Sequence, residues 1–134
     1  MPKPTAIDHL VLTVADVAVT VSFYRDVLGM AAQTFQAADG GTRTALTFGA
    51  QKINLHPADR PFDPKAGRPT PGSADLCLLT DDALVDWQAH FAQAGVTVID
   101  GPVGRTGATG PIRSLYVRDP DGNLIEVSVS EHRA

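Results

Sequence analysis

Four polar side chains interrupt segments that are otherwise aliphatic, and their types suit the binding of a metal ion. His9 stands among aliphatic residues in IDHLVLTV, which has the composition of a β-strand. The segments KINLH, ADLCLLT and NLIEVSV carry corresponding exceptions, which are Asn54 or His56, Asp75 and Glu126. A carboxylate in a half-buried cleft is unfavourable unless it is paired, hydrogen-bonded or bound to a cation. A divalent metal ion accepts both carboxylates and neutral imidazole, so we predict His9, Asp75, Glu126 and His56 as metal ligands.

Strand alternation places these polar residues on one kind of face. In the first segment His9 and Val11 share a face, and Leu10 and Leu12 share the opposite one. The other three segments show the same division between an aliphatic face, which would pack on helices, and a face that carries the polar exception. If the strands curl into a partly closed sheet, the four polar faces line one concavity.

Several of these residues also have an ordinary structural interpretation. His9 is compatible with a core histidine that bonds to a backbone carbonyl group. Asp75 is compatible with a carboxylate bonded to a nearby loop, and His56 with a residue that simply ends a strand. Both interpretations, functional and structural, are consistent with the sequence pattern.

Glu126, Cys77 and Arg105 have alternatives of their own. Glu126 has possible ion-pair partners in Arg113 and Arg118. Cys77 is predicted to share the polar face, where a small buried filler is a more common role than a nucleophile. Arg105 lies in the glycine-rich segment GPVGRTGATGP, which we expect to be an ordinary connection, a mobile lid or an anion-binding nest. In the last two cases Arg105 would meet a substrate carboxylate.

The elements that must position these residues occur in the same order twice. The first half predicts a strand at 6–14, a helix from Asp16 to Gly29, and strands at 30–35, 43–48 and 51–56. The second half predicts a strand at 74–80, a helix capped by Thr80, Asp81 or Asp82, strands at 96–99, 112–118 and 123–130, and a glycine-rich loop at 101–111.

Two landmarks support an internal duplication of this β-α-β-β-β order. Asp75 follows His9 by 66 residues, and Gly95 follows Gly29 by the same interval. Five prolines between residues 57 and 72 predict a stiff linker between the halves. We therefore expect a single domain over residues 1–134, with module one at about 6–56, the linker at 57–72 and module two at about 73–130.

Composition restricts the class of protein. About 43% of the 134 residues are apolar, which is enough to bury a core, and the net charge of −4 disfavours nucleic acid as a partner. We find no apolar run long enough to cross a membrane and no secretory signal at the N-terminus. Cys77 is the only cysteine, so no intrachain disulfide can form, and a cytoplasmic location is expected.

Three segments, IDHLVLTV, FYRDVLGM and RDPDGNLIEVS, together with the repeated order of elements, carry a family resemblance. The chain resembles the vicinal-oxygen-chelate superfamily, which includes glyoxalase I, bleomycin-resistance proteins, fosfomycin-resistance enzymes and extradiol dioxygenases. The resemblance runs from about Ile7 to Ser130. The segments FGAQKINLH and PGSADLCLLT look closer still to a small group of glyoxalase-domain and virulence-protein-like chains.

The resemblance implies a ligand set drawn from the first and last strand of each module. By position these ligands would be His9, Asp75 and Glu126, with Asn54 or His56 as the fourth. Glyoxalase I typically has glutamates on both last strands, whereas this chain has only Glu126. Extradiol dioxygenases typically use two histidines and one glutamate, whereas this chain has Asp75 at the second first-strand position.

We therefore expect an α+β protein of two βαβββ modules that form a cupped mixed sheet with the helices outside. The resemblance implies a homodimeric lyase or isomerase of the glyoxalase I type that acts on a small vicinal-oxygen substrate. Its divalent metal would be Zn, Ni, Mn or Fe, Glu126 would move the proton, and Asn54 and Arg105 would contact the substrate. The alternatives are a metal-free protein that sequesters a ligand, as bleomycin-resistance proteins do, and an Fe-dependent dioxygenase.

Overall fold

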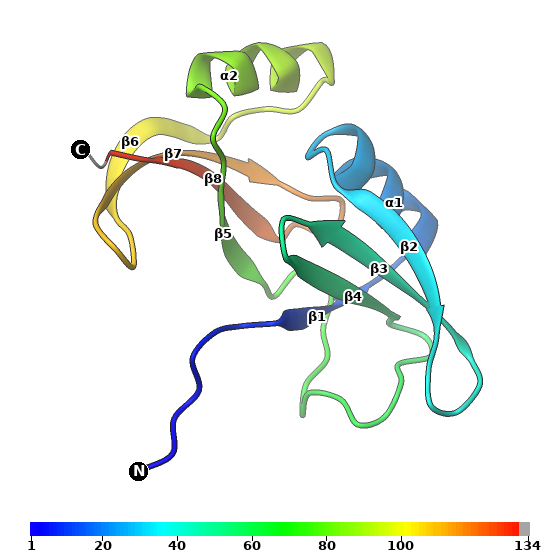
Figure 1. Cartoon of the computed structure of the whole chain (residues 1–134). Helices are drawn as coiled ribbons and strands as arrows, with labels where there is room; N and C mark the ends of the chain where they lie inside the picture. The colour runs from blue at the N-terminus through cyan, green and yellow to red at the C-terminus, as the bar shows by residue number, and fades with distance from the viewer. Residues whose placement is uncertain (132–134) are drawn as a thin grey trace. The chain divides into compact units, whose positions relative to one another are not determined.

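A computed structural model of the chain describes residues 1–131, which form two compact units (Figure 1). Unit 1 comprises Met1–Pro71, and unit 2 begins at Gly72. The boundary coincides with the end of the predicted linker, and each predicted module lies within one unit.

Unit 1 contains a four-stranded mixed sheet and one helix. Its elements are β1 (His9–Val14), α1 (Val17–Asp26), β2 (Ala31–Gln36), β3 (Thr42–Phe48) and β4 (Gln51–Pro57). The strand order is β1-β4-β3-β2, in which β1 is parallel to β4 and the other pairs are antiparallel.

Unit 2 repeats this arrangement. Its elements are β5 (Asp75–Leu79), α2 (Leu84–Gln93), β6 (Asp100–Thr106), β7 (Pro111–Arg118) and β8 (Leu124–Ser130). The strand order is β5-β8-β7-β6, again with a parallel pair formed by the first and last strands. The predicted α+β class with two βαβββ modules is confirmed.

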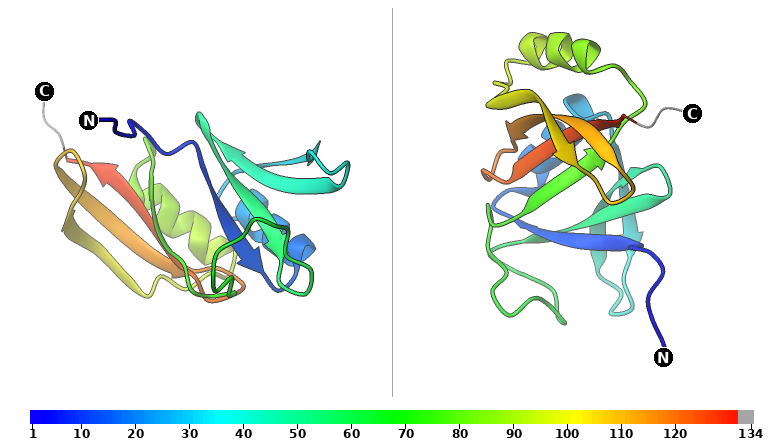
Figure 2. Two further views of the ribbon diagram at one scale, coloured as in Figure 1. Left: turned by 90° about the horizontal axis from the view of Figure 1, so that it is seen from below. Right: turned by 90° about the vertical axis from the view of Figure 1, so that its left-hand side faces the viewer.

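The aliphatic faces of the strands are buried, as alternation predicted. Leu12, Ile53 and Leu55 are almost fully buried in unit 1, and so are Ile125 and Val127 in unit 2. The helices α1 and α2 each lie on one face of the sheet of their own unit (Figures 1 and 2). The opposite faces are therefore the ones that present polar side chains.

Two features of unit 2 differ from the prediction. The segment 96–99 is not a strand, and most of the expected loop at 101–111 belongs to β6 and β7. Strand β6 lies at the edge of the sheet, where Pro102 does not interrupt a ladder of hydrogen bonds. Gly101 has a φ of +102°, and a Cβ atom there would collide with the backbone of Ser114, so this glycine permits the bulge at the start of the strand.

The predicted cap of the second helix was also wrong. The N-cap is Ala83, which makes no side-chain capping bond. The Thr80 hydroxyl oxygen instead accepts hydrogen bonds from the backbone of Asp82 and from Nε1 of Trp87, both at 3.1 Å. Thr80 thus contacts the first turn of α2 through the side chain of Trp87.

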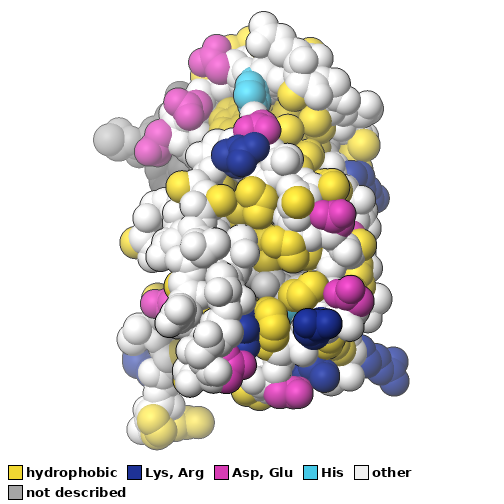
Figure 3. All heavy atoms as spheres, turned by 90° about the vertical axis from the view of Figure 1, so that its right-hand side faces the viewer, with side chains coloured by type: hydrophobic (Ala, Val, Ile, Leu, Met, Phe, Trp, Pro, Cys, Tyr) yellow, Lys and Arg dark blue, Asp and Glu magenta, His cyan; other side chains and the backbone are white. Residues whose placement is uncertain are grey.

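Charges are mixed on the face drawn in Figure 3, where Lys and Arg side chains lie between Asp and Glu side chains.

None of the helices within residues 1–131 is long and apolar enough to span a membrane.

The predicted cap of the first helix is present, and it gives a first testable expectation. Asp16 Oδ1 accepts a hydrogen bond from the backbone N–H of Val19 at 3.0 Å. Replacing Asp16 with Ala leaves that N–H without its partner, so we expect Asp16→Ala to lower the free energy of unfolding by about 1 kcal/mol in a urea titration followed by circular dichroism. Asp26→Ala, at the exposed end of the same helix, is the matched control and should leave the midpoint unchanged. Equal midpoints for the wild type and Asp16→Ala would contradict the capping role.

Candidate functional site

Strand register gathers the polar residues of unit 2 on one face of its sheet. Glu126 lies opposite Tyr116 on β7 and opposite Cys77 on β5. Ser114 lies opposite Ser128 in the same ladder. Paired residues point to the same side of a sheet, so these side chains share the face opposite the one that packs in the aliphatic core.

Hydroxyl groups hold the Glu126 carboxylate. Ser114 Oγ donates to Glu126 Oε2 at 2.5 Å, and Ser128 Oγ donates to the same oxygen at 3.4 Å. The two serine oxygens lie 2.7 Å apart, and both serines are fully buried. Glu126 is thus oriented by neutral donors, which leave its negative charge available to a proton or a cation.

The ion pair considered for Glu126 is wrong. Arg113 Nε lies 3.7 Å from Oε1 of Glu131, and Arg118 donates to the carbonyl oxygen of Gly122 at 3.3 Å. Within the described chain neither guanidinium group forms a salt bridge with Glu126.

Tyr116 and Arg105 form the other side of this polar face. Arg105 Nε donates to the Tyr116 hydroxyl at 3.0 Å, and its Nη2 lies 3.5 Å from Oδ2 of Asp100. Burial raises the pKa of Tyr116 and the nearby Glu126 carboxylate raises it further, whereas the bond from Arg105 lowers it. Tyr116 is therefore a protonated phenol at neutral pH. Arg105 lies in strand β6 and is held there, rather than being carried on a free loop.

A cavity of about 370 Å³ opens on this face of unit 2. Its lining includes three residues singled out from the sequence, Asp75, Arg105 and Glu126, together with Tyr116 and Arg118. The loop bond considered for Asp75 is wrong, because its exposed side chain makes no hydrogen bond or ion pair with any residue in the 1–131 range. Sequence reasoning missed Tyr116, although alternation along IRSLYVRD places it on the same face as Ser114 and Arg118.

Cys77 also belongs to this face, and the expectation of a buried filler is wrong because the residue is exposed. Its Sγ lies 3.3 Å from the hydroxyl oxygen of Ser128. Burial raises the pKa of the Cys77 thiol, the contact with Ser128 lowers it, and the Glu126 and Asp75 carboxylates raise it. The thiol is therefore protonated at neutral pH, which argues against a role as nucleophile.

In unit 1 the register separates the two predicted histidines. Across the parallel pair His9 lies opposite Lys52, and Thr13 lies opposite His56. His9 and His56 thus share a face but lie four residues apart in register, which is about 13 Å along the strands.

The two units can be compared position by position. Val11 pairs with Asn54 in unit 1, as Cys77 pairs with Glu126 in unit 2. Asn54 therefore occupies the position that Glu126 has in the other unit, and His56 corresponds to Ser128. By the same comparison His9 corresponds to Asp75, in agreement with the spacing of 66 residues.

His9 is not a core residue, since 42% of its side chain is exposed, and the core interpretation is wrong. Its Nδ1 lies 2.9 Å from Oδ1 of Asp8, an adjacent carboxylate. A carboxylate on Nδ1 favours the tautomer in which Nε2 presents its lone pair. The roles of His9 and His56 as metal ligands stay predictions.

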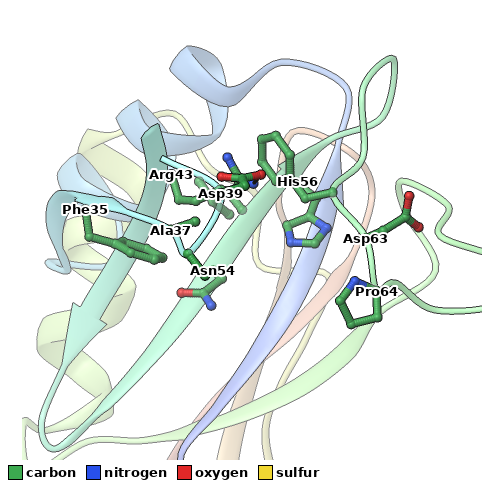
Figure 4. A pocket seen from close by; sticks show the side chains of 11 residues that line it. Phe35, Ala37, Asp39, Arg43, Asn54, His56, Asp63 and Pro64 are labelled. Atoms are coloured by element: carbon green, nitrogen blue, oxygen red, sulfur yellow. Dashed lines mark hydrogen bonds and ion pairs between the residues drawn. The ribbon is translucent and has the colours of Figure 1, made fainter. Parts of the chain in front are cut away.

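Asn54 and His56 both face a second cavity, of about 310 Å³, which lies wholly within unit 1 (Figure 4). Burial lowers the pKa of His56, and the positive charge of Arg43 lowers it further. The imidazole is therefore uncharged at neutral pH.

Comparison with known proteins agrees with this architecture. The family model described as the Glyoxalase/Bleomycin resistance protein/Dioxygenase superfamily matches residues 6–127. The chain belongs to this superfamily.

Two relatives show how closely the superfamily members can resemble this chain. Virulence protein STM3117 of Salmonella typhimurium is 58% identical over 122 residues, which cover 91% of this chain and 82% of the relative. Its crystal structure matches with a TM-score of 0.87 at 53% identity, over 96% of this chain and 98% of the other. The Glyoxalase domain-containing protein RDO1 of Mycosarcoma maydis is 52% identical over 123 residues, or 92% of this chain and 67% of the relative.

Because many members of the superfamily use a divalent metal, the donor atoms of each unit are relevant. No group of three or more His, Cys, Asp or Glu side chains within residues 1–131 is close enough to hold a metal ion by itself. Unit 2 does offer two carboxylates on one cavity, Asp75 and Glu126, and neither forms an ion pair with an arginine of residues 1–131. Oxygen donors of this type fit a divalent cation as part of its coordination shell.

The electrostatics of this superfamily member can be tested at Cys77. Removing the Glu126 charge removes its repulsion of the thiolate, so we expect Glu126→Gln to lower the pKa of Cys77. The pKa is measured from the ultraviolet absorbance of the thiolate as a function of pH. Glu131→Gln, which removes a carboxylate paired with Arg113, is the matched control and should leave the titration unchanged. An unshifted titration in Glu126→Gln would contradict the placement of the two side chains on one face.

Proposed function

We propose that this protein is an enzyme of the glyoxalase type that moves a proton between adjacent carbon atoms of a small oxygenated substrate. The observation that carries the proposal is the Glu126 carboxylate, which two serine hydroxyls orient and with which no guanidinium group of residues 1–131 forms a salt bridge. A carboxylate in this state is a suitable general base when it faces a cavity.

Other residues of the same cavity fit complementary roles. Tyr116, which is protonated at neutral pH, can donate its hydroxyl hydrogen to a substrate oxygen on which negative charge develops. Arg105 lies on the same cavity and is held by Tyr116 and Asp100, so its guanidinium is suited to orient a substrate carboxylate or carbonyl. Proton removal by Glu126 would thus occur beside groups that stabilise the resulting charge.

The superfamily also supports a divalent metal. In unit 2 the residues that would hold it are Asp75 and Glu126, and His9 is the further ligand predicted from the sequence. His56 was predicted too, but it lies four residues from His9 in register, about 13 Å along the strands, so one ion would not bind both histidines. Zn²⁺, Ni²⁺, Mn²⁺ and Fe²⁺ are all compatible with mixed nitrogen and oxygen donors. A bound metal would supply Lewis-acid stabilisation of negative charge on the substrate oxygens. We also propose that the protein is a homodimer and is located in the cytoplasm.

The role of Glu126 as base is tested with the hemithioacetals of methylglyoxal with glutathione and with 2-mercaptoethanol. Formation of the thioester is followed by absorbance, and exchange of the substrate C–H in deuterated water is followed by NMR. We expect Glu126→Gln to reduce both rates by about 10²- to 10⁴-fold, the usual contribution of a positioned general base. Glu131→Gln is the matched control and should retain the wild-type rates. Undiminished exchange in Glu126→Gln would remove Glu126 from the mechanism.

Metal dependence is tested by elemental analysis of protein purified without chelator or nickel affinity resin. We expect near-stoichiometric transition metal in the wild type and its loss in the double variant His9→Ala, Glu126→Ala, because both substitutions remove predicted ligands. Wild-type protein that stays metal-free after incubation with Zn²⁺, Ni²⁺, Mn²⁺ and anaerobic Fe²⁺ would contradict the metal-dependent reaction and favour a ligand-binding protein.

Consumption of oxygen during turnover would favour a dioxygenase instead.

A further inference from the structure

The cavity of unit 1 lies on the sheet face opposite the aliphatic core. Phe35 on β2 pairs with Arg43 on β3, and Asn54 and His56 follow on β4, all directed to this face. The segment after β4 contributes Phe62 and Pro64, and Figure 4 shows Pro64 beside the ring of His56. The cavity is thus bounded by three strands, by residues 37–39 of the turn between β2 and β3, and by the first part of the proline-rich linker.

Two polar atoms in this cavity lack a hydrogen-bond partner among the described residues. They are Oδ1 of Asn54 and Nδ1 of His56, and both are buried. Buried polar atoms in folded proteins are nearly always hydrogen-bonded, so such a pair indicates a missing ligand group. The two side chains are two residues apart on one strand face, and Figure 4 shows them projecting in the same general direction. A hydroxyl group can donate to the amide oxygen and also bond to the imidazole nitrogen.

A guanidinium group is held in place at the same cavity. Arg43 Nη2 lies 2.7 Å from Oδ2 of Asp39, and its Cζ lies 3.3 Å from the centroid of the Phe62 ring. Only 12% of the Arg43 side chain is exposed. Of its five N–H groups, Asp39 takes one and the carbonyl oxygen of Thr42 takes another, so others remain for a ligand oxygen. An ordered guanidinium of this kind is well suited to bind a carboxylate.

We propose that this cavity binds a small hydroxycarboxylic acid. The carboxylate lies on Arg43, the hydroxyl bridges Asn54 and His56, and the carbon skeleton packs against Phe35 and Phe62. A volume of about 310 Å³ equals that of roughly ten water molecules, which limits the ligand to a similar number of heavy atoms. The site goes beyond the proposed reaction, because Arg43 and the aromatic walls take no part in proton transfer by Glu126. Asn54 and His56, which the sequence predicted as a substrate contact and a metal ligand, are assigned here to the hydroxyl group of this second ligand.

Mandelate is a suitable probe, because it combines a carboxylate, an adjacent hydroxyl and an aromatic ring within this size. Phenylacetate lacks only the hydroxyl, and mandelamide lacks only the charge. We expect isothermal titration calorimetry on the full chain to detect mandelate binding, with phenylacetate and mandelamide each at least about tenfold weaker, since each loses a hydrogen-bonded group.

Variants assign the binding to this cavity. Asn54→Leu removes the orphaned acceptor while keeping a branched side chain of four heavy atoms, and Arg43→Met removes the charge while keeping an unbranched side chain. We expect each to weaken mandelate binding by at least about tenfold, and Asn54→Leu to remove the preference for mandelate over phenylacetate. Arg25→Met, at an exposed position of α1, is the matched control for the loss of an arginine and should bind as the wild type does. Circular dichroism confirms that each variant is folded.

Three results would overturn the proposal. The first is the absence of binding by mandelate in the millimolar range. The second is equal affinity for mandelate and phenylacetate, which would mean that the buried Asn54 and His56 atoms do not recognise a hydroxyl. The third is unchanged mandelate binding in a folded Asn54→Leu variant. None of these measurements depends on catalytic turnover. A failure of the binding proposal can therefore be distinguished from a failure of the proposed role of Glu126.

Discussion

The parallel pairing of the first strand with the last strand of each unit determines where the functional side chains lie. Parallel strands cannot be joined by a tight turn, so the helix and two further strands form the connection between them. Ile53 and Ile125 point from these pairs into the core, and a shift of register by one residue would turn both outward. Burial of the aliphatic face therefore fixes the register, and the register fixes Asn54 beside Val11 and Glu126 beside Cys77.

The same framework carries different chemistry in the two units. In unit 2 the residue beside the first strand is Glu126. Neutral serine hydroxyls donate hydrogen bonds to its carboxylate and orient it without cancelling its charge. In unit 1 the corresponding position is Asn54, an amide that cannot accept a proton at neutral pH. Its charged neighbour in the cavity is Arg43, which is held in place by an ion pair with Asp39 and by stacking on the Phe62 ring. The duplicated fold thus presents a proton acceptor in one half and a set of hydrogen-bonding groups in the other.

Much of the fold followed from the sequence, because alternation and helix signals act locally. The order of elements, the buried faces and the Asp16 cap were all predictable. Strand β6 was not, because its glycines and Pro102 resemble a loop until the strand is known to lie at an edge. Asn54 and His56 could not be told apart, since both point to the same face and only the pairing with β1 distinguishes them. Tyr116 became evident as a site residue only through its pairing with Glu126.

The proline-rich segment shows why a composition-based interpretation can miss a functional element. Prolines exclude a helix or a strand ladder there, and the sequence therefore predicts only a spacer. In the structure Phe62 packs face-on against Arg43 and edge-on against His56, whose ring centroid lies 5.1 Å away. One aromatic ring thus restrains both a cation and an imidazole on the adjacent sheet. Restrained side chains lose little conformational entropy when a ligand binds, so this segment contributes to recognition by ordering the groups that make the contacts.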